Sequence, residues 1–473
     1  LGTNRMFCHR QDCHSKCRAQ PHAAVACLWL CFVSIPAYAD DSNFSRRSML
    51  AGDVDRVRVR ELVPGLDWSL LYAGEVFEVA SGGVESGAVY EDLIDLEVHA
   101  DLEELLGWTG GGAHVSLYQI NNGGRNAADL VATLSDPSNI DARPTFRLFT
   151  AYIQQKFSGG GSLRIGQIAA DDEFFISTTA SRLINSTFGW PDIAEADLPS
   201  GGPAYPLATP GVRLKLNPRD DVRLLGAVFS GDPAGDCPAE RDPQDCNDHG
   251  TTFSFTGGTL LMGETRYRPK PSARGTIGSA YRVGGWYHTG TFADQEFGNG
   301  EDGSFISLVD EPDRPIAREG NWGLYAIVDQ ALWQGDTTKI TAFWRGGIAP
   351  PDRNFISWYV DAGLGVRGVV ANRPDDVLTV GFAQSNVSRD DAVLDRTARR
   401  LFGFPNKVRR GSTVLELTYS AALTQYWTLQ PDLQYIVYSG VRAGRLRSFR
   451  SSGRRGTSLR LADCRLVLSG AFS

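Results

Sequence analysis

Carboxylates, phenylalanines and basic residues lie close together in one stretch of the chain, and chemistry is most readily expected there. The candidate residues are Arg164, Asp171, Asp172, Glu173, Phe174, Phe175, Arg213 and Lys215. A pair of carboxylates such as Asp171 and Glu173 is what glycoside hydrolysis requires, one as acid and one as nucleophile or base. The same carboxylates opposite basic groups would instead set up a transverse electric field across a narrow polar passage.

Other catalytic patterns are missing from the sequence. The seven histidines are scattered without metal-ligand spacing, and Cys8, Cys13 and Cys17 fit no zinc pattern. There is no G-x-S-x-G elbow and no glycine-rich phosphate loop. We therefore expect no metal, no cofactor and no enzymatic activity, with a secreted glycoside hydrolase as the alternative.

Residues 171–209 form the connection that must position these groups. The connection is rich in Pro, Gly and acidic residues, and alternating segments flank it at 162–170 and 211–216. Connections this long without clear structure of their own are usually functional. We expect this one to fold into the bore of a barrel as a constriction loop. Wall residues that alternation places on the same inner side are Arg223, Arg282 and Arg345, and the aromatic residues of the loop that either stack on a solute or pack it in place are Phe188, Trp190 and Tyr205.

The N-terminus resembles an export signal. A basic stretch precedes an apolar run from Ala23 to Ile35, which ends at the small residues before Asp40. The run is shorter than the ~18 apolar residues that a membrane helix needs. We therefore expect a signal peptide at 1–39, a periplasmic tail at 40–67 and a barrel domain at 68–473.

Cysteine usage agrees with export. Five of the eight cysteines fall in the segment expected to be removed. Cys237 and Cys246 could close a small loop by a disulfide in an oxidising compartment, which would leave Cys464 unpaired. The pairing is a disulfide candidate on these grounds.

Average composition does not decide the fold class. The 42% hydrophobic content and mean hydropathy of −0.22 suit both a water-soluble protein and a membrane barrel, whose strands spend half their residues on a polar lumen. The net charge of −8 and pI near 5.5 argue against nucleic acid as a partner. The fold class must therefore be inferred from the periodicity of apolar and polar residues along the chain.

Alternating segments separated by turn signals recur along the chain, and there are about sixteen of them. They span residues 68–80, 90–104, 113–121, 145–157, 162–170, 211–216, 222–230, 251–267, 276–291, 321–333, 339–348, 356–371, 377–387, 413–423, 428–438 and 459–472. Within one such segment Val212, Leu214 and Leu216 share a face, with Arg213 and Lys215 on the other. An even number of two-faced strands is typical of a closed bacterial membrane barrel.

The connections indicate the same fold. Short turns at 107–112, 158–161, 217–221, 334–338, 372–376 and 425–427 alternate with longer connections at 122–144, 171–209, 231–250, 292–319 and 388–412. Short periplasmic turns and long extracellular loops produce this parity. The fold class is therefore predicted to be all-β: a transmembrane antiparallel β-barrel of about sixteen strands with an infolded constriction loop.

Several motifs resemble the carbohydrate-selective porin family, the OprB-like proteins of Gram-negative outer membranes. The motifs lie at 168–177, 184–191, 198–211, 321–325, 348–354 and 424–427. The resemblance implies passive diffusion of monosaccharides such as glucose across an outer-membrane lipid bilayer, through a barrel narrowed by loops. A monomer and a homotrimer both stay open, and a receptor or adhesin barrel is a second alternative.

Binding of a neutral sugar would give the eight candidate residues a role. A hexose carries many hydroxyls and apolar C–H faces, so a selective pore offers donors and acceptors beside aromatic surfaces. The eight candidate residues would supply both. The alternative is that the carboxylates only tie the loop to wall arginines.

The end of the chain departs from the family pattern. Residues 439–473 are basic and rich in Ser and Gly, and Phe472 is penultimate rather than terminal. One hypothesis is a reading-frame slip near Ser439, which peptides from an unbroken tail would contradict. If the tail is genuine, 459–472 must serve as the closing strand.

Overall fold

The computed structural model describes residues 57–131, 133–269, 278–310, 312–402, 408–424, 426–438 and 466–472. The predicted signal peptide at 1–39, most of the tail at 40–67 and most of the segment 439–473 lie outside the described residues. No helix in the described ranges combines the length and apolar character needed to cross a bilayer.

Antiparallel strands hold more than half of the described residues. They are β1 (Val57–Val63), β2 (Leu66–Ser81), β3 (Gly87–Asp101), β4 (Gly111–Asn121), β5 (Thr145–Lys156), β6 (Ser162–Ile168), β7 (Thr209–Arg219), β8 (Val222–Ser230), β9 (Thr259–Tyr267), β10 (Ala280–Asn299), β11 (Phe305–Ser307), β12 (Pro315–Gln334), β13 (Lys339–Ile348), β14 (Ile356–Arg367), β15 (Val377–Val387), β16 (Gly411–Ala422), β17 (Thr428–Tyr438) and β18 (Leu466–Phe472). The helices are short except the last: α1 (Leu102–Leu106), α2 (Ala127–Val131), η1 (Ala180–Arg182), α3 (Ser186–Gly189), α4 (Asp192–Asp197), η2 (Pro199–Gly201), α5 (Pro243–Cys246) and α6 (Arg389–Phe402).

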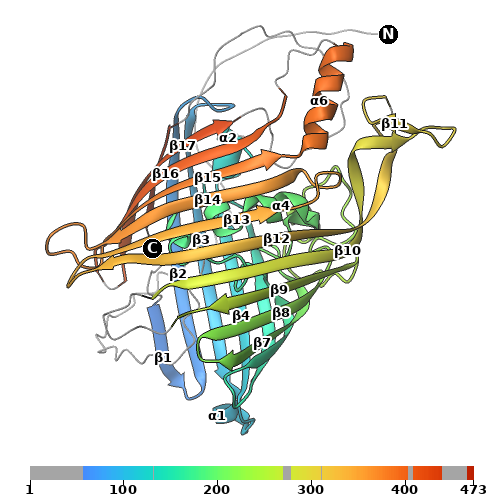
Figure 1. The fold of residues 1–473 in the computed structure, drawn as a ribbon. Helices are drawn as coiled ribbons and strands as arrows, with labels where there is room; N and C mark the ends of the chain where they lie inside the picture. Colours follow the sequence, from blue (N-terminus) through green and yellow to red (C-terminus); the bar gives the residue numbers. More distant parts are fainter. Residues whose placement is uncertain are drawn as a thin grey trace, which may run out of the picture. The chain divides into compact units, whose positions relative to one another are not determined.

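Sixteen of these strands pair with a neighbour on both sides. Each pairs with the next along the chain, except that β10 pairs with β12 across the short β11. The last strand, β18, pairs with β17 and also with β2. Figure 1 shows the long strands side by side in this order. The structure therefore has the β-barrel fold predicted from the sequence, and all sixteen predicted strands are present.

Burial in the barrel is inverted relative to a water-soluble protein. The largest fully buried side chains include Arg147, Arg213 and Arg345, whereas Val283 is 66% exposed and Leu324 is 55% exposed. Because side chains alternate along a strand, the apolar residues share the outer face and the charged ones the inner face. An apolar exterior around a polar interior is the arrangement that a strand barrel needs in lipid.

Aromatic residues mark the height of the apolar band on β12. Trp322 and Trp333 are both exposed; Trp333 lies near the end of the strand and Trp322 lies eleven residues before it. A register shift between Ala331 and Trp333 turns the second tryptophan to the outer face, which strict alternation from Trp322 would not allow. Eleven residues at ~3.3 Å each, tilted by about 40°, rise roughly 28 Å, close to the height of an outer-membrane apolar band.

The predicted alternation of short and long connections holds only in part. The turns at one end are short, as expected, although residues 102–110 include α1. At the other end the connections 82–86 and 349–355 are also short, so strict alternation is wrong. The segment 292–319 is mostly strand, because β10 and β12 continue as a paired hairpin beyond the neighbouring strands, with β11 at its tip.

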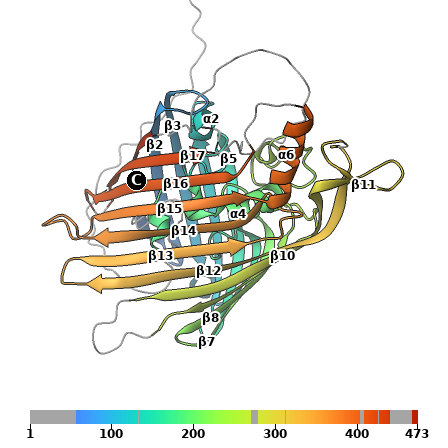
Figure 2. The same cartoon turned by 45° about the horizontal axis from the view of Figure 1, so that its top comes forward.

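Three elements differ from the sequence-based expectation. Residues 57–63 were expected in a tail and instead form β1, because the chain folds back at Gly65 and pairs with the start of β2. The strand expected from 251 begins at Thr259, after Gly257 and Gly258 adopt positive φ angles. The connection 388–412 contains α6, which lies beside the end of β10 in Figure 2.

Candidate functional site

The connection between β6 and β7 folds back inside the barrel. It leaves β6 after Ile168 and returns at Thr209, and the two strands pair directly with each other. Along it lie η1, α3, α4 and η2. Most of its apolar side chains are buried in the main core cluster, which also holds residues from strands β8 to β17. We refer to residues 169–208 as the infolded loop.

Hydrogen bonds show that the infolded loop reaches strands on the far side of the pairing order from β6 and β7. The amide N–H of Asn185 donates to the Glu416 carboxylate on β16 at 3.0 Å, and the Asn185 side-chain amide donates to Gln434 on β17 at 3.0 Å. Gln430, also on β17, donates to the carbonyl of Arg182 at 2.8 Å. The loop therefore crosses the barrel interior, as the sequence predicts.

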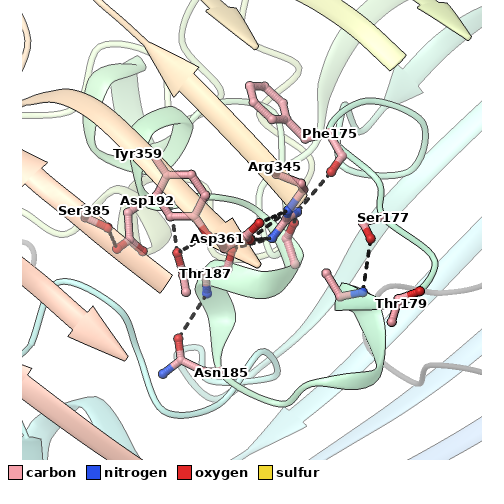
Figure 3. A network of polar contacts seen from close by, with 12 residues as sticks. Phe175, Ser177, Thr179, Asn185, Thr187, Asp192, Arg345, Tyr359, Asp361 and Ser385 are labelled. Atoms are coloured by element: carbon pink, nitrogen blue, oxygen red, sulfur yellow. Dashed lines mark hydrogen bonds and ion pairs between the residues drawn. The ribbon is translucent and has the colours of Figure 1, made fainter. Parts of the chain in front are cut away.

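Arg345 on β13 is the main anchor of the infolded loop. Its guanidinium donates to the carbonyls of Phe175, Thr187 and Gly189 at 3.0, 3.0 and 3.1 Å (Figure 3). Its Nε donates to the Asp361 carboxylate of β14 at 2.9 Å, and a second nitrogen also bonds that carboxylate. All five guanidinium donors are therefore used, and the arginine is fully buried.

The anchor holds a strained segment of backbone. Phe175 has a φ of 60°, a left-handed conformation that a bulky residue rarely adopts. Such a residue persists only where its surroundings fix it, at a cost of about 1–3 kcal/mol. Here Arg345 binds the carbonyl, and the Phe175 ring stacks on Tyr325 with centroids 3.7 Å apart.

A second set of contacts surrounds Asp192 on α4. Its carboxylate accepts from Ser135 at 2.6 Å. It also accepts from Ser385 on β15, as Figure 3 shows. Burial raises the pKa of this carboxyl above its ordinary value, and the serine hydroxyls only partly offset the effect. The contacts join the infolded loop to the connection 122–144 and to the wall.

Glu173 forms a clamp with two wall arginines. One of its carboxylate oxygens lies 2.8 Å from a guanidinium nitrogen of Arg164 on β6 and 2.8 Å from one of Arg213 on β7. Arg164 also donates to Gln154 at 2.7 Å and covers the ring of Tyr152. Burial alone would raise the pKa of Glu173, but Arg164 and Arg213 outweigh it and lower the pKa to about 2.

Three of the predicted site residues are covered by the loop itself. Asp171 accepts a hydrogen bond from the backbone N–H of Tyr205 at 2.9 Å, and burial, aided by Asp172, raises the pKa of Asp171 to about 7. Phe174 and Phe175 are 1% and 3% exposed and pack against wall residues. The geometry therefore gives these three residues a part in holding the loop and does not present them to a solute.

The remaining predicted residues are partly exposed or lie against a partly exposed residue, and we call this part of the structure the open side of the loop. Asp172, Glu173 and Lys215 are partly exposed. The buried Arg164 and Arg213 are paired with Glu173. Arg223 is also partly exposed, whereas Arg282 is buried and paired with Asp329 at 2.6 Å. The structure thus brings most of the predicted basic residues to one side of the lumen.

The loop aromatics that the sequence left undecided are packing residues. Phe188 and Trp190 are buried, and Trp190 donates its indole N–H to the carbonyl of Gly201 at 2.9 Å. The Tyr205 hydroxyl donates to the carbonyl of Ile140 at 2.8 Å. These contacts hold the loop.

Sequence reasoning missed two polar wall residues of β9. Glu264 accepts from the Tyr325 hydroxyl at 2.7 Å and from the N–H of Phe175 at 3.3 Å, and it also pairs with Arg266. Alternation with exposed Leu261 on the same strand could have placed both on the inner face. The predicted start of this strand at 251 obscured that pattern.

Cys237 and Cys246, the disulfide candidate, form a disulfide in the connection between β8 and β9. Asn247, next to Cys246, donates to the carbonyl of Pro233 at 3.0 Å, and the buried Arg147 donates to the Asn247 carbonyl. Across the described ranges no cluster of histidines, cysteines and carboxylates is arranged to hold a metal ion.

Comparison with known proteins follows this geometry. Residues 85–445 match the family described as "Carbohydrate-selective porin, OprB family". Porin B of Pseudomonas aeruginosa is 23% identical over 424 residues, which cover 85% of this chain and 90% of that protein. The high-pH structure of Pseudomonas putida OprB has a TM-score of 0.73 at 21% identity, covering 86% of this chain and 93% of that chain. At this identity the structural match shows a shared fold.

Proposed function

The chain belongs to the carbohydrate-selective porin family, and from that premise we propose that it lets monosaccharides such as glucose diffuse passively through its barrel. Proteins of this family are channels of the Gram-negative outer membrane and not enzymes. We further propose that residues 1–39 are the signal peptide that such an address requires. The pair Asp171 and Glu173 is accordingly given no catalytic role.

The observation that carries the proposal is the infolded loop fixed across the interior. The loop is tied to β13, β14, β16 and β17 through the contacts of Arg345, Tyr359, Glu416 and Gln434. A loop held on both sides reduces the open cross-section of a sixteen-stranded barrel. Size selection among sugars is the expected result.

The chemistry of the loop's open side fits a polyhydroxylated solute. Glu173, Arg164 and Arg213 offer carboxylate lone pairs and guanidinium N–H donors beside the partly exposed Asp172 and Lys215. Sugar hydroxyls bind such charged partners through hydrogen bonds. We assign sugar contact to these five residues, and loop support to Asp171, Phe174 and Phe175.

The test is single-channel recording in planar lipid bilayers. Glucose on one side is expected to interrupt the current at millimolar concentrations, and a trisaccharide of the same hydroxyl chemistry is expected to block far less. Liposome swelling should rank the same sugars in the same order. A current that no sugar interrupts, from protein with the heat-modifiable gel migration of a folded barrel, would overturn the proposal.

A further inference from the structure

Six basic residues form a ladder on the inner face of five adjacent strands. They are Arg164 on β6, Arg213 and Lys215 on β7, Arg223 on β8, Arg266 on β9 and Arg282 on β10. The register places Arg164 opposite Arg213, and Arg266 opposite both Arg223 and Arg282. Residues directly opposite each other share a face of the sheet. We call this set the basic ladder.

The basic ladder carries more positive charge than its partners neutralise. Glu173 pairs with Arg164 and Arg213, Glu264 pairs with Arg266, and Asp329 pairs with Arg282. Among the described residues, these three carboxylates form ion pairs with four of the six basic groups. In the described part of the chain, no carboxylate lies within ion-pair distance of Lys215 or Arg223.

The two ladder groups without an ion pair among the described residues are also partly exposed. Lys215 and Arg223 are both partly exposed, and they stand diagonally across β7 and β8 because Lys215 is opposite Leu225. Within the described ranges Arg223 makes one side-chain hydrogen bond, a long one to Asn217 at 3.4 Å. Buried nitrogens of Arg213, Arg266 and Arg282 also have no hydrogen-bond partner, and such donors call for water or an anion.

Carboxylates on the other inner strands do not balance this charge for a passing solute. Glu75 is hydrogen-bonded to Ser138 at 2.8 Å, and Ser69 donates to Glu97 at 3.2 Å. Both carboxylates are at least nine-tenths buried, as is Asp95, which accepts from Ser116. These three carboxylates are therefore largely withheld from a passing solute, whereas Asp172 and Glu173 on the loop are partly exposed.

We propose that the basic ladder is a binding site for monosaccharides that carry a carboxylate, so that sugar acids are substrates of this pore beside neutral sugars. A uronic acid has the ring and hydroxyls of the neutral sugar, which the loop side of the site would bind, and a single negative charge for Lys215 and Arg223. The inference rests on the proposed sugar-channel function.

The experiment compares glucuronate with glucose, since the two differ only in the carboxylate at C6. Channel block by each is recorded at constant ionic strength in 0.1 M KCl, together with the reversal potential in a KCl gradient. Wild-type protein is expected to prefer chloride over potassium and to be blocked by glucuronate about tenfold more tightly than by glucose. Raising the salt to 1 M should remove most of that difference.

The double variant Lys215→Gln/Arg223→Gln removes two charges without breaking an ion pair found among the described residues. Its preference for glucuronate over glucose is expected to disappear. Its glucose block should fall by less than its glucuronate block, because Lys215 also contacts the neutral sugar. The matched control is Arg399→Gln/Arg400→Gln, which removes two exposed charges from α6 and should leave both sugars unaffected. Lys215→Gln alone serves if the double variant does not assemble.

The outcomes separate the two proposals. If glucose blocks but glucuronate binds no better and chloride is not preferred, the sugar-acid site is wrong and the sugar channel stands. If the control lowers the glucuronate block as much as the ladder variant does, the charge acts from the surface and the site is again wrong. If neither sugar blocks, the proposed channel function itself fails.

Discussion

Two arginine-centred sites hold the infolded loop, and they differ in what they leave available to a solute. At the anchor, Arg345 uses all five donors, three on loop carbonyls and two on Asp361, and both side chains are fully buried. At the clamp, Arg164 and Arg213 share one oxygen of Glu173, which is partly exposed. A saturated site can only hold structure, whereas an unsaturated one can also exchange partners.

The infolded loop is therefore held rigidly at the anchor, and its proposed contacts with the solute lie elsewhere, at the clamp. The anchor lies against β13 and β14, and the clamp lies against β6 and β7. A pore that releases its solute needs weak, exchangeable contacts on a fixed frame. A variant that removes the anchor should leave the clamp residues in place, and a variant that removes the clamp should leave the anchor in place.

The largest effect is expected from Arg345→Ala. The change leaves Asp361 as a buried unpaired charge and three loop carbonyls without their donor, a loss of about 3–5 kcal/mol. The loop should leave the interior, so the single-channel conductance should rise severalfold and sugar block should disappear. Conductance and glucose titration in bilayers measure both.

Arg345→Lys is the graded version of that experiment. Lysine keeps the charge but cannot reproduce the planar fork that spans Phe175, Thr187 and Asp361. Its conductance should lie between those of the wild type and Arg345→Ala. A folded Arg345→Ala barrel with unchanged conductance and sugar block would show that the anchor does not hold the loop.

Glu173→Gln should give the second largest effect and act on the clamp alone. The amide keeps the shape and removes the charge that faces Arg164 and Arg213, so a charge-assisted contact worth about 1.5 kcal/mol is lost. Glucose block should weaken about tenfold, and conductance should stay within about twofold because the anchor remains. Bilayer titration of the variant measures both quantities.

Glu195→Gln is the matched control on the same loop. Burial, followed by the nearby Asp192, raises the pKa of Glu195 to about 8, so this group is mostly neutral at pH 7 and an amide resembles it. The control should block like the wild type. Equal losses in both variants would mean that the loop responds to any change of carboxylate, and the clamp would have no special role.

Much of the fold was predictable because a barrel repeats one simple pattern. The segments 339–348, 377–387 and 428–438 have the predicted bounds, since each carries mostly apolar residues at alternate positions on one face and lies between turn residues. The alternation of apolar and polar residues does not predict a strand whose formation depends on a tertiary contact. Val57–Val63 carries three charged and four apolar residues and becomes a strand because it pairs with the first residues of β2, ahead of the part of β2 that pairs with β18.

The candidate site was predictable in its residues but less so in their roles. Residue types and their spacing in the sequence predicted that Arg164, Glu173 and Arg213 lie together, and in the structure these residues form the clamp. The same reasoning gave Asp171 and Phe175 to the solute, and the structure buries them. Which side of a structureless loop faces the lumen depends on how it packs, and no periodicity records that.

The clamp and its neighbour should respond to pH with opposite signs. Glu173 has a pKa lowered from 4.5 to about 2, so its contribution is complete above pH 4.5 and is lost as the pH falls through 2. Asp171 has a pKa raised to about 7, so its neutral form favours docking at low pH and loses that contribution as the pH rises through 7. Glucose block should therefore persist to about pH 3.5 and decline only below it. A midpoint near pH 4.5 would mean that Glu173 is not paired with the two arginines.

The smallest effect is expected from Asp172→Asn, and it tests how sharply the clamp is distinguished from its surroundings. Asp172 is partly exposed and directly precedes Glu173, the carboxylate that pairs with both clamp arginines. Exposed charged contacts are worth at most about 1 kcal/mol, so glucose block should change about twofold with no change in conductance. If the Asp172 variant loses as much block as Glu173→Gln, recognition follows the total negative charge of the loop, and the shared carboxylate between Arg164 and Arg213 is not what selects the solute.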